Sequence, residues 1–237
     1  MNLPGVYNIF LDKWWDKQTV WLYADPHFGD AELAAALPLR PSDEEQIKLI
    51  NSKVGKKDVL IILGDCGDPA MCAKLRGYKV LIMGNHDAGR SNYEKKVVLQ
   101  KFPKEAYSKF DALDNMRRCY PNYKYSIIEE NYPFEYWKVF ADNKLFDLVF
   151  TGPLMLGEKL ILSHEPLNIN WAFNIHGHSH SGPIGKDGNH LNVCSDVIGY
   201  SPINLNQLLK RGLTSKVLSV HEQSIAVATK NKREREI

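Results

Sequence analysis

The sequence has few of the features that mark secreted or membrane proteins. Its four cysteines, Cys66, Cys72, Cys119 and Cys194, form no CxxC pair, so neither a disulfide framework nor a thiolate zinc site is supported and reduced thiols are expected. Apolar runs long enough to span a bilayer are absent, and proline and charged residues interrupt the stretch from Met1 to Asp16. We therefore expect a soluble, cytoplasmic protein with no membrane partner.

An excess of charge of one sign is also missing. Thirty Lys and Arg face 28 Asp and Glu, which gives a net charge of +2, so bulk electrostatics do not indicate nucleic-acid binding, although a local site stays possible. The sequence contains no internal repeat and no low-complexity linker. A chain of 237 residues with 44% hydrophobic residues suits one sizeable core. We expect a single domain spanning residues 1–237.

Three continuous apolar runs each end in a polar corner, namely Val20–Ala24, Val59–Leu63 and Val80–Met83. Continuous rather than alternating apolarity predicts strands buried on both faces. Between the first two runs, Ser42 and Glu45 have capping-box spacing and predict a helix N-terminus. Strand, helix, strand is typical of parallel pairing, and open α/β sheets gather polar side chains at the carboxyl ends of their strands. The three corners should therefore meet in space.

The second half predicts more sheet. A helix is expected from Ser91 to Lys101, and an aromatic-rich segment follows at 102–150, either as hairpins that pack on the core or as an insertion that caps the substrate. Further strands are predicted at Phe146–Phe150, Lys159–Ser163, Ala172–Ile175 and Leu191–Cys194, a short helix at Leu205–Lys210, and a solvated tail at Lys230–Glu236. The expected fold class is α/β (α+β), a two-layer β-sandwich core flanked by helices.

Five clusters of oxygen and imidazole ligands lie at the predicted strand ends: Asp25-Pro26-His27, Gly64-Asp65, Gly84-Asn85-His86-Asp87, Ser163-His164-Glu165 and Gly177-His178-Ser179-His180. Each cluster alone also fits a turn or a hydrogen-bonded core histidine. Together, in order and beside strand ends, they indicate a metal site. Imidazole combined with carboxylate and amide oxygen suits Mn, Fe, Zn or Co, whereas Mg and Ca prefer oxygen alone.

The ordered set resembles the calcineurin-like metallophosphoesterase superfamily, whose pattern is Asp-x-His, Gly-Asp, Gly-Asn-His-Asp/Glu, His and Gly-His-x-His. The run from Asp25 to Gly29, with Arg40 and Pro41 downstream, is similar to small bacterial and phage members. The resemblance implies a β-sandwich with flanking helices, which agrees with the strands predicted above.

The resemblance also implies roles for individual residues. One metal would take Asp25, His27 and His180, the other Asn85, His164 and His178, and Asp65 would bridge them. Two divalent ions, Mn foremost with Fe, Zn, Co and Ni as alternatives, would hold a bridging hydroxide as the nucleophile. His86 would act as general acid or charge stabiliser, with Asp87 fixing its tautomer; the alternative for His86 is a purely structural role. Apart from the resemblance, the residue type makes Arg40 a candidate for bidentate contact with a substrate phosphate; the alternative is a solvent-exposed arginine at a loop end.

The function implied is hydrolysis of phosphate mono- or diesters, foremost a small or nucleotide-like phosphodiester. A nuclease acting on single-stranded ends, a protein phosphatase and a non-catalytic metal-binding scaffold are the alternatives. The complete set of ligand positions argues against the scaffold. The sequence leaves open the physiological substrate, the native metal and the oligomeric state.

Overall fold

The computed structural model describes residues 19–87, 93, 97–119, 123–141, 145–182 and 188–235. Its strands are β1 (Val20–Tyr23), β2 (Val59–Leu63), β3 (Tyr78–Ile82), β4 (Val97–Pro103), β5 (Tyr125–Glu130), β6 (Tyr136–Ala141), β7 (Leu148–Phe150), β8 (Leu154–Met155), β9 (Leu160–Leu162), β10 (Phe173–His176), β11 (His190–Asn192) and β12 (Ile203–Asn204). Its helices are α2 (Ala31–Ala36), α3 (Asp43–Lys53), α4 (Pro69–Cys72), α5 (Lys109–Cys119), α6 (Leu205–Lys210) and α7 (Val220–Arg235), with a 3₁₀ turn at Asn85–Asp87.

Two of the three sheets carry parallel strands. The first has the order β12-β1-β2-β3-β7, in which β1, β2, β3 and β7 run parallel and β12 is antiparallel. The second has the order β11-β10-β9-β8, and only β8 is antiparallel. The parallel pairing predicted for the first two apolar runs is confirmed, and their polar corners share one edge of the sheet.

The two parallel sheets enclose a common core. Leu22 and Ile61 of the first sheet belong to one buried cluster with Leu162 and Ile175 of the second. Because successive side chains point to opposite faces of a strand, the intervening residues, such as Ile62, pack in a second cluster with the helices. Burial on both faces explains why the strand sequences are continuously apolar. The predicted fold class, a two-layer β core flanked by helices, is confirmed.

Helix α3 begins where its capping signal predicts. The Ser42 hydroxyl accepts a hydrogen bond from the Glu45 backbone N–H, and the Glu45 carboxylate accepts one from the Ser42 N–H. These reciprocal bonds satisfy two backbone donors that a helix N-terminus otherwise leaves unpaired. The predicted helix Leu205–Lys210 is also confirmed as α6.

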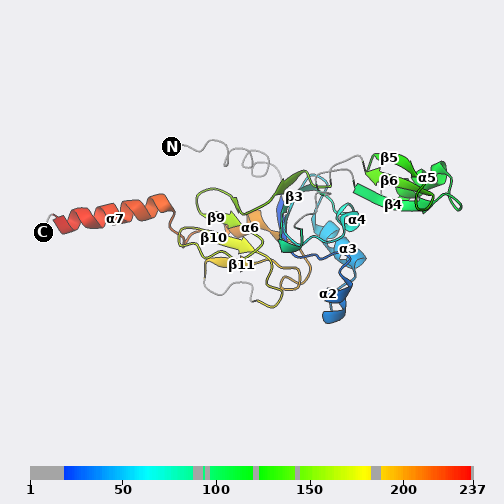
Figure 1. Ribbon diagram of the computed structural model, residues 1–237. Coiled ribbons are helices and arrows are strands. Elements are labelled where there is room, and N and C mark those ends of the chain that lie inside the picture. The colour runs from blue at the N-terminus through cyan, green and yellow to red at the C-terminus, as the bar shows by residue number, and fades with distance from the viewer. Residues whose placement is uncertain are drawn as a thin grey trace.

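The predicted helix ending at Lys101 is wrong over its described part. Residues 97–103 form strand β4, which pairs with β6 and places Phe102 opposite Trp137. Cross-strand pairing of β-branched and aromatic residues outweighs the helical pattern here. Strands β4, β6 and β5 form the third sheet, which together with α5 we call the aromatic lobe; Figure 1 shows it at one end of the molecule.

The predicted tail is the end of helix α7, whose side chains from 230 to 234 are exposed as expected. Ser219 and Glu222 form a second capping box that explains the helix start. The helix projects away from the body in Figure 1. Among the described residues no helix has both the length and the apolarity to cross a bilayer. Cys66, Cys72 and Cys194 are buried free thiols.

Candidate metal centre and active site

The ligand clusters converge because each follows a parallel strand of the sandwich. Asp25 follows β1, Asp65 follows β2 and the turn Asn85–Asp87 follows β3, whereas His164 follows β9 and His178 follows β10. Carboxyl ends of parallel strands lie at a shared edge. The backbone joins the corners directly, since the Asp25 N–H donates to Gly64 O at 3.1 Å and the Gly177 N–H donates to His164 O at 2.9 Å.

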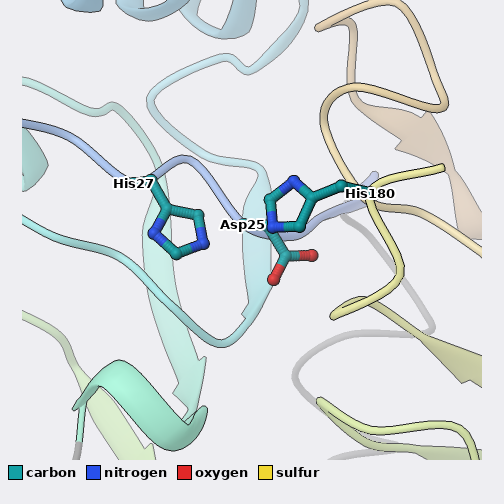
Figure 2. Close-up of side chains that lie close together, drawn as sticks. All are labelled: Asp25, His27 and His180. Carbon is teal, nitrogen blue, oxygen red and sulfur yellow. The ribbon is translucent and has the colours of Figure 1, made fainter. Parts of the chain in front are cut away.

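Asp25, His27 and His180 form the first candidate group, with one ligand atom from each lying within 4.8 Å of the others. Figure 2 shows the His180 ring above the Asp25 carboxylate, with the His27 ring beside them. Asp25 Oδ1 and His27 Nε2 are buried and have no hydrogen-bond partner in the part of the chain that the structure describes. Buried polar atoms without partners are rare in proteins. A cation between them would satisfy both, so this group fits a metal.

Asp65, His164 and His178 form the second group. The Nδ1 atom of His164 lies 2.9 Å from the Leu63 carbonyl oxygen, which makes Nδ1–H the donor and leaves Nε2 as a lone pair. That Nε2 lies 2.9 Å from Asn85 Oδ1 and 3.1 Å from His178 Nδ1. Ring nitrogens and an amide oxygen that converge in this way can form a coordination shell for a cation.

Asp65 lies between the two groups. Its Oδ2 is 3.5 Å from His27 Nε2 and 3.4 Å from His164 Nε2, while its Oδ1 accepts a hydrogen bond from the His86 N–H. One carboxylate oxygen therefore faces a ring nitrogen from each group. This is the placement that a bridging ligand requires.

Burial shapes the ionisation of the first group. Removal from water raises the pKa of the Asp25 carboxyl to about 6, against the opposing effect of His164. Burial likewise lowers the pKa of His27 to about 4. Neutral imidazole is the form that binds metals, so His27 is held ready to ligate over most of the physiological pH range.

Backbone strain concentrates at the same positions. In the part of the chain that the structure describes, five residues other than glycine have positive φ: Asp25 (55°), His27 (44°), Asp65 (52°), His178 (65°) and Tyr200 (58°). Four of them are candidate ligands. Such conformations cost about 1–3 kcal/mol each and cluster at functional sites.

The glycines before the clusters are needed partly because a side chain would clash there, and not only because the backbone turns sharply. A Cβ on Gly177 would lie 2.4 Å from Asp25 Oδ2, and one on Gly84 would lie 2.2 Å from Asp65 Oδ1. Both distances are far below van der Waals contact. The side chains at these two positions would displace the carboxylates themselves.

His86 and Asp87 lie side by side in the chain but face different surroundings. His86 is exposed, and its ring centroid is 5.3 Å from that of His27. Asp87 is fully buried and accepts four hydrogen bonds, from Tyr93 Oη and from the backbone N–H groups of Asp65, Cys66 and Gly84. A carboxylate has about four acceptor sites. These contacts favour a structural role for Asp87 over the predicted control of the His86 tautomer.

Arg40 does not extend into solvent, which rules out the exposed alternative. Its side chain is 4% exposed and its guanidinium pairs with Asp196, at 2.8 and 2.9 Å from the two carboxylate oxygens. Asp196 is not among the site residues predicted from the sequence, although it lies shortly after β11 at the same kind of strand end as the other clusters.

A cleft of about 310 Å³ opens beside the first group. Its lining residues come from the corner after β1, the start of α2 and the two neighbouring corners: His27, Phe28, Gly29, Asp30, Ala31, Glu32, Gly67 and His86. Residues 102–150 contribute none of the described lining. The cleft places His86 and His27 on one surface that a substrate can reach.

A third group of potential metal ligands, His180, Cys194 and Asp196, shares His180 with the first group. A two-layer β core with such groups at its strand ends is typical of the metallophosphoesterase class. The model of the calcineurin-like phosphoesterase family matches residues 18–204, and the chain belongs to that family. Curated proteins give no significant match. Among solved structures, a protein of unknown function from Aquifex aeolicus is similar, with a TM-score of 0.52, 16% identity, and coverage of 82% of this chain and 100% of that one. At that identity the likeness supports the fold alone.

Proposed function

We propose that the protein is a phosphoesterase with two divalent cations, one in each ligand group and both in contact with Asp65. The observation that carries the proposal is the pair of buried polar atoms, Asp25 Oδ1 and His27 Nε2, that have no hydrogen-bond partner among the described residues. They lie beside the convergent ring nitrogens of His164 and His178. When bound, the cations would polarise phosphoryl oxygens and lower the pKa of a water molecule. The mixed nitrogen and oxygen ligands favour Mn, with Fe, Zn, Co and Ni as alternatives.

The chain's own residues would bind and protonate the ester. His86 is exposed on the cleft surface next to His27, where its ring can donate a proton to the departing oxygen. Asp87 would hold the Asp65 and Gly84 corners in register through their N–H groups. These bonds would keep the ligand positions fixed.

The cleft supports a small substrate, foremost a phosphodiester of small or nucleotide-like size. A volume of about 310 Å³ suits a small ester, and Asp30 and Glu32 on the lining would repel a polyanion. No described residue of the aromatic lobe lines this cleft. This favours a lobe that packs on the core over one that caps the substrate. Single-stranded nucleic acid is therefore the weaker candidate.

The test is a hydrolysis panel on metal-stripped protein. We expect no turnover of a monoester, a diester, a cyclic nucleotide or a short single-stranded DNA in excess chelator, and restoration by Mn above Mg, fastest on the small diester. Asp65→Asn should lower the restored rate by about 10² or more. Asp58→Asn is the matched control, because Asp58 accepts its bonds just before β2, away from the strand ends that carry the site.

Full activity after complete metal removal would contradict the metal-dependent mechanism. If the protein cleaves DNA faster than it hydrolyses any small ester, the proposed substrate class is wrong and the nuclease alternative is correct. Equal rates for Asp65→Asn and the control would show that the site lies elsewhere.

A further inference from the structure

Asp196 is a buried carboxylate at the centre of a hydrogen-bond network behind the first ligand group. Its side chain is 8% exposed. Oδ1 accepts from Tyr200 Oη at 2.6 Å, Oδ2 lies 2.6 Å from His180 Nδ1, and Arg40 Nη1 approaches both oxygens. The pairing of Asp196 with the always-charged Arg40 guanidinium holds the group as a carboxylate.

The network determines which His180 nitrogen faces the site. An ionised carboxylate only accepts hydrogen bonds, so His180 Nδ1 must carry the proton in its bond to Asp196. The lone pair is then on Nε2, the other ring nitrogen. A histidine ligand fixed through its second nitrogen by a carboxylate is held in the tautomer and orientation that a metal needs.

Arg40 connects the same carboxylate to the corner that carries the other two ligands. Its Nη2 donates to the carbonyl oxygens of Asp25, at 3.2 Å, and Pro26. Ser195, next to Asp196, donates its hydroxyl to the Asp25 carbonyl at 2.8 Å. The corner includes the strained backbones of Asp25 and His27, and such strain persists only where surrounding contacts hold it. Tyr200, the third partner, has a strained backbone itself.

We propose that Asp196 is a positioning residue that, through His180 on one side and Arg40 on the other, fixes the three ligands of the first group relative to one another. This inference rests on the proposed metal site, and it assigns Arg40 to ligand placement instead of phosphate binding. It predicts an asymmetry: loss of Asp196 weakens the first site and leaves the second intact, because His164 takes its tautomer from the Leu63 carbonyl.

The experiment compares wild type with Asp196→Asn, an almost isosteric variant that removes the charge. In metal-free protein, side-chain ¹⁵N NMR should show His180 as the Nδ1–H tautomer in wild type and as a mixture in Asp196→Asn. Manganese titration followed by electron paramagnetic resonance should show one site weakened about 10–100-fold and the other unchanged. Arg40→Lys, which loses the second guanidinium nitrogen that binds the Asp25 and Pro26 carbonyls, should weaken the same site with the His180 tautomer retained.

Asp58→Asn is the control and should leave both manganese sites and the His180 tautomer as in wild type. An unchanged tautomer in Asp196→Asn, or equal weakening of both sites, would overturn the proposal and leave Asp196 with a purely structural role. Neither readout involves hydrolysis. Two manganese sites with the predicted asymmetry but no turnover would therefore refute the proposed activity while supporting the positioning role.

Discussion

At the scale of single residues, the site consists of ligands with strained backbone conformations, and the neighbouring glycines are packed too closely to carry a side chain. Asp25, His27, Asp65 and His178 all have positive φ, and Gly177 touches the Asp25 carboxylate so closely that a methyl group has no place. The sequence shows a glycine before the histidine, but spacing alone cannot say whether conformation or space demands it.

Gly177→Ala tests the crowding. Its Cβ would lie 2.4 Å from Asp25 Oδ2 and 2.6 Å from the Ala24 Cβ, so the corner must shift. We expect the free energy of unfolding to fall by about 1–3 kcal/mol and manganese to bind more weakly at the first site. Gly152→Ala is the control, since its Cβ meets nothing within 4 Å. Denaturation curves and binding isotherms that match for the two variants would disprove this account of Gly177.

His86 and His178 should differ in what their loss removes. His178→Ala leaves the second group incomplete and should lower metal content and slow every ester. His86→Ala should keep both metals and slow alkyl or nucleoside esters by about 10²–10⁴, with a smaller effect on a nitrophenyl ester that needs little protonation. Metal stoichiometry and rates on a leaving-group series distinguish them. If His86→Ala loses metal, or slows all esters equally, His86 is not the general acid.

At the scale of elements, strand β3 connects the sandwich to the aromatic lobe through a buried lysine. Lys79 Nζ donates to Tyr123 Oη at 3.0 Å and to the Cys72 carbonyl at 3.3 Å. Tyr123 lies just before β5, and its hydroxyl also bonds to the Ala73 carbonyl. Hydrogen bonds of Tyr123 thus connect the lobe to β3 of the first sheet and to the end of α4. Sequence periodicity cannot show this, because a lysine within an apolar run reads as an exposed residue.

Lys79 makes stability depend on pH in alkaline solution. Burial lowers its pKa from the ordinary 10.5 to about 8. Between these values the unfolded chain keeps a proton that the folded protein has released, so the free energy of unfolding rises with pH, by roughly 3 kcal/mol in full. Below pH 8 both states are protonated and the cost of burying the charge is constant.

Lys79→Met should remove this rise. Urea denaturation from pH 7.5 to 9.5 should show wild type gaining stability relative to the variant as pH increases. The comparison cancels the thiols and tyrosines, which titrate in both proteins. Parallel profiles for the two proteins would show that Lys79 is protonated in the folded state throughout.

At the scale of the whole molecule, the strand-end rule accounts for what the sequence could predict. Asp25, Asp65 and His164 follow continuous apolar runs, and the parallel sheets bring those ends together. Asp196 also lies near a strand end, but its pairing with Arg40, 156 residues away along the chain, is not visible in the sequence. The buried position of Asp87 is likewise not visible in the sequence, because two of its donors follow another strand, β2, and a third is the Tyr93 hydroxyl. Strand β4 was mistaken for a helix because its partner, β6, lies more than 30 residues away.

The most direct test of the two-cation site is anomalous diffraction at the manganese edge from crystals equilibrated with saturating manganese. We predict two peaks. One should lie among Asp25, His27 and His180, the other among Asn85, His164 and His178, with an Asp65 oxygen in contact with both. A single peak, or peaks away from Asp65, would contradict the account.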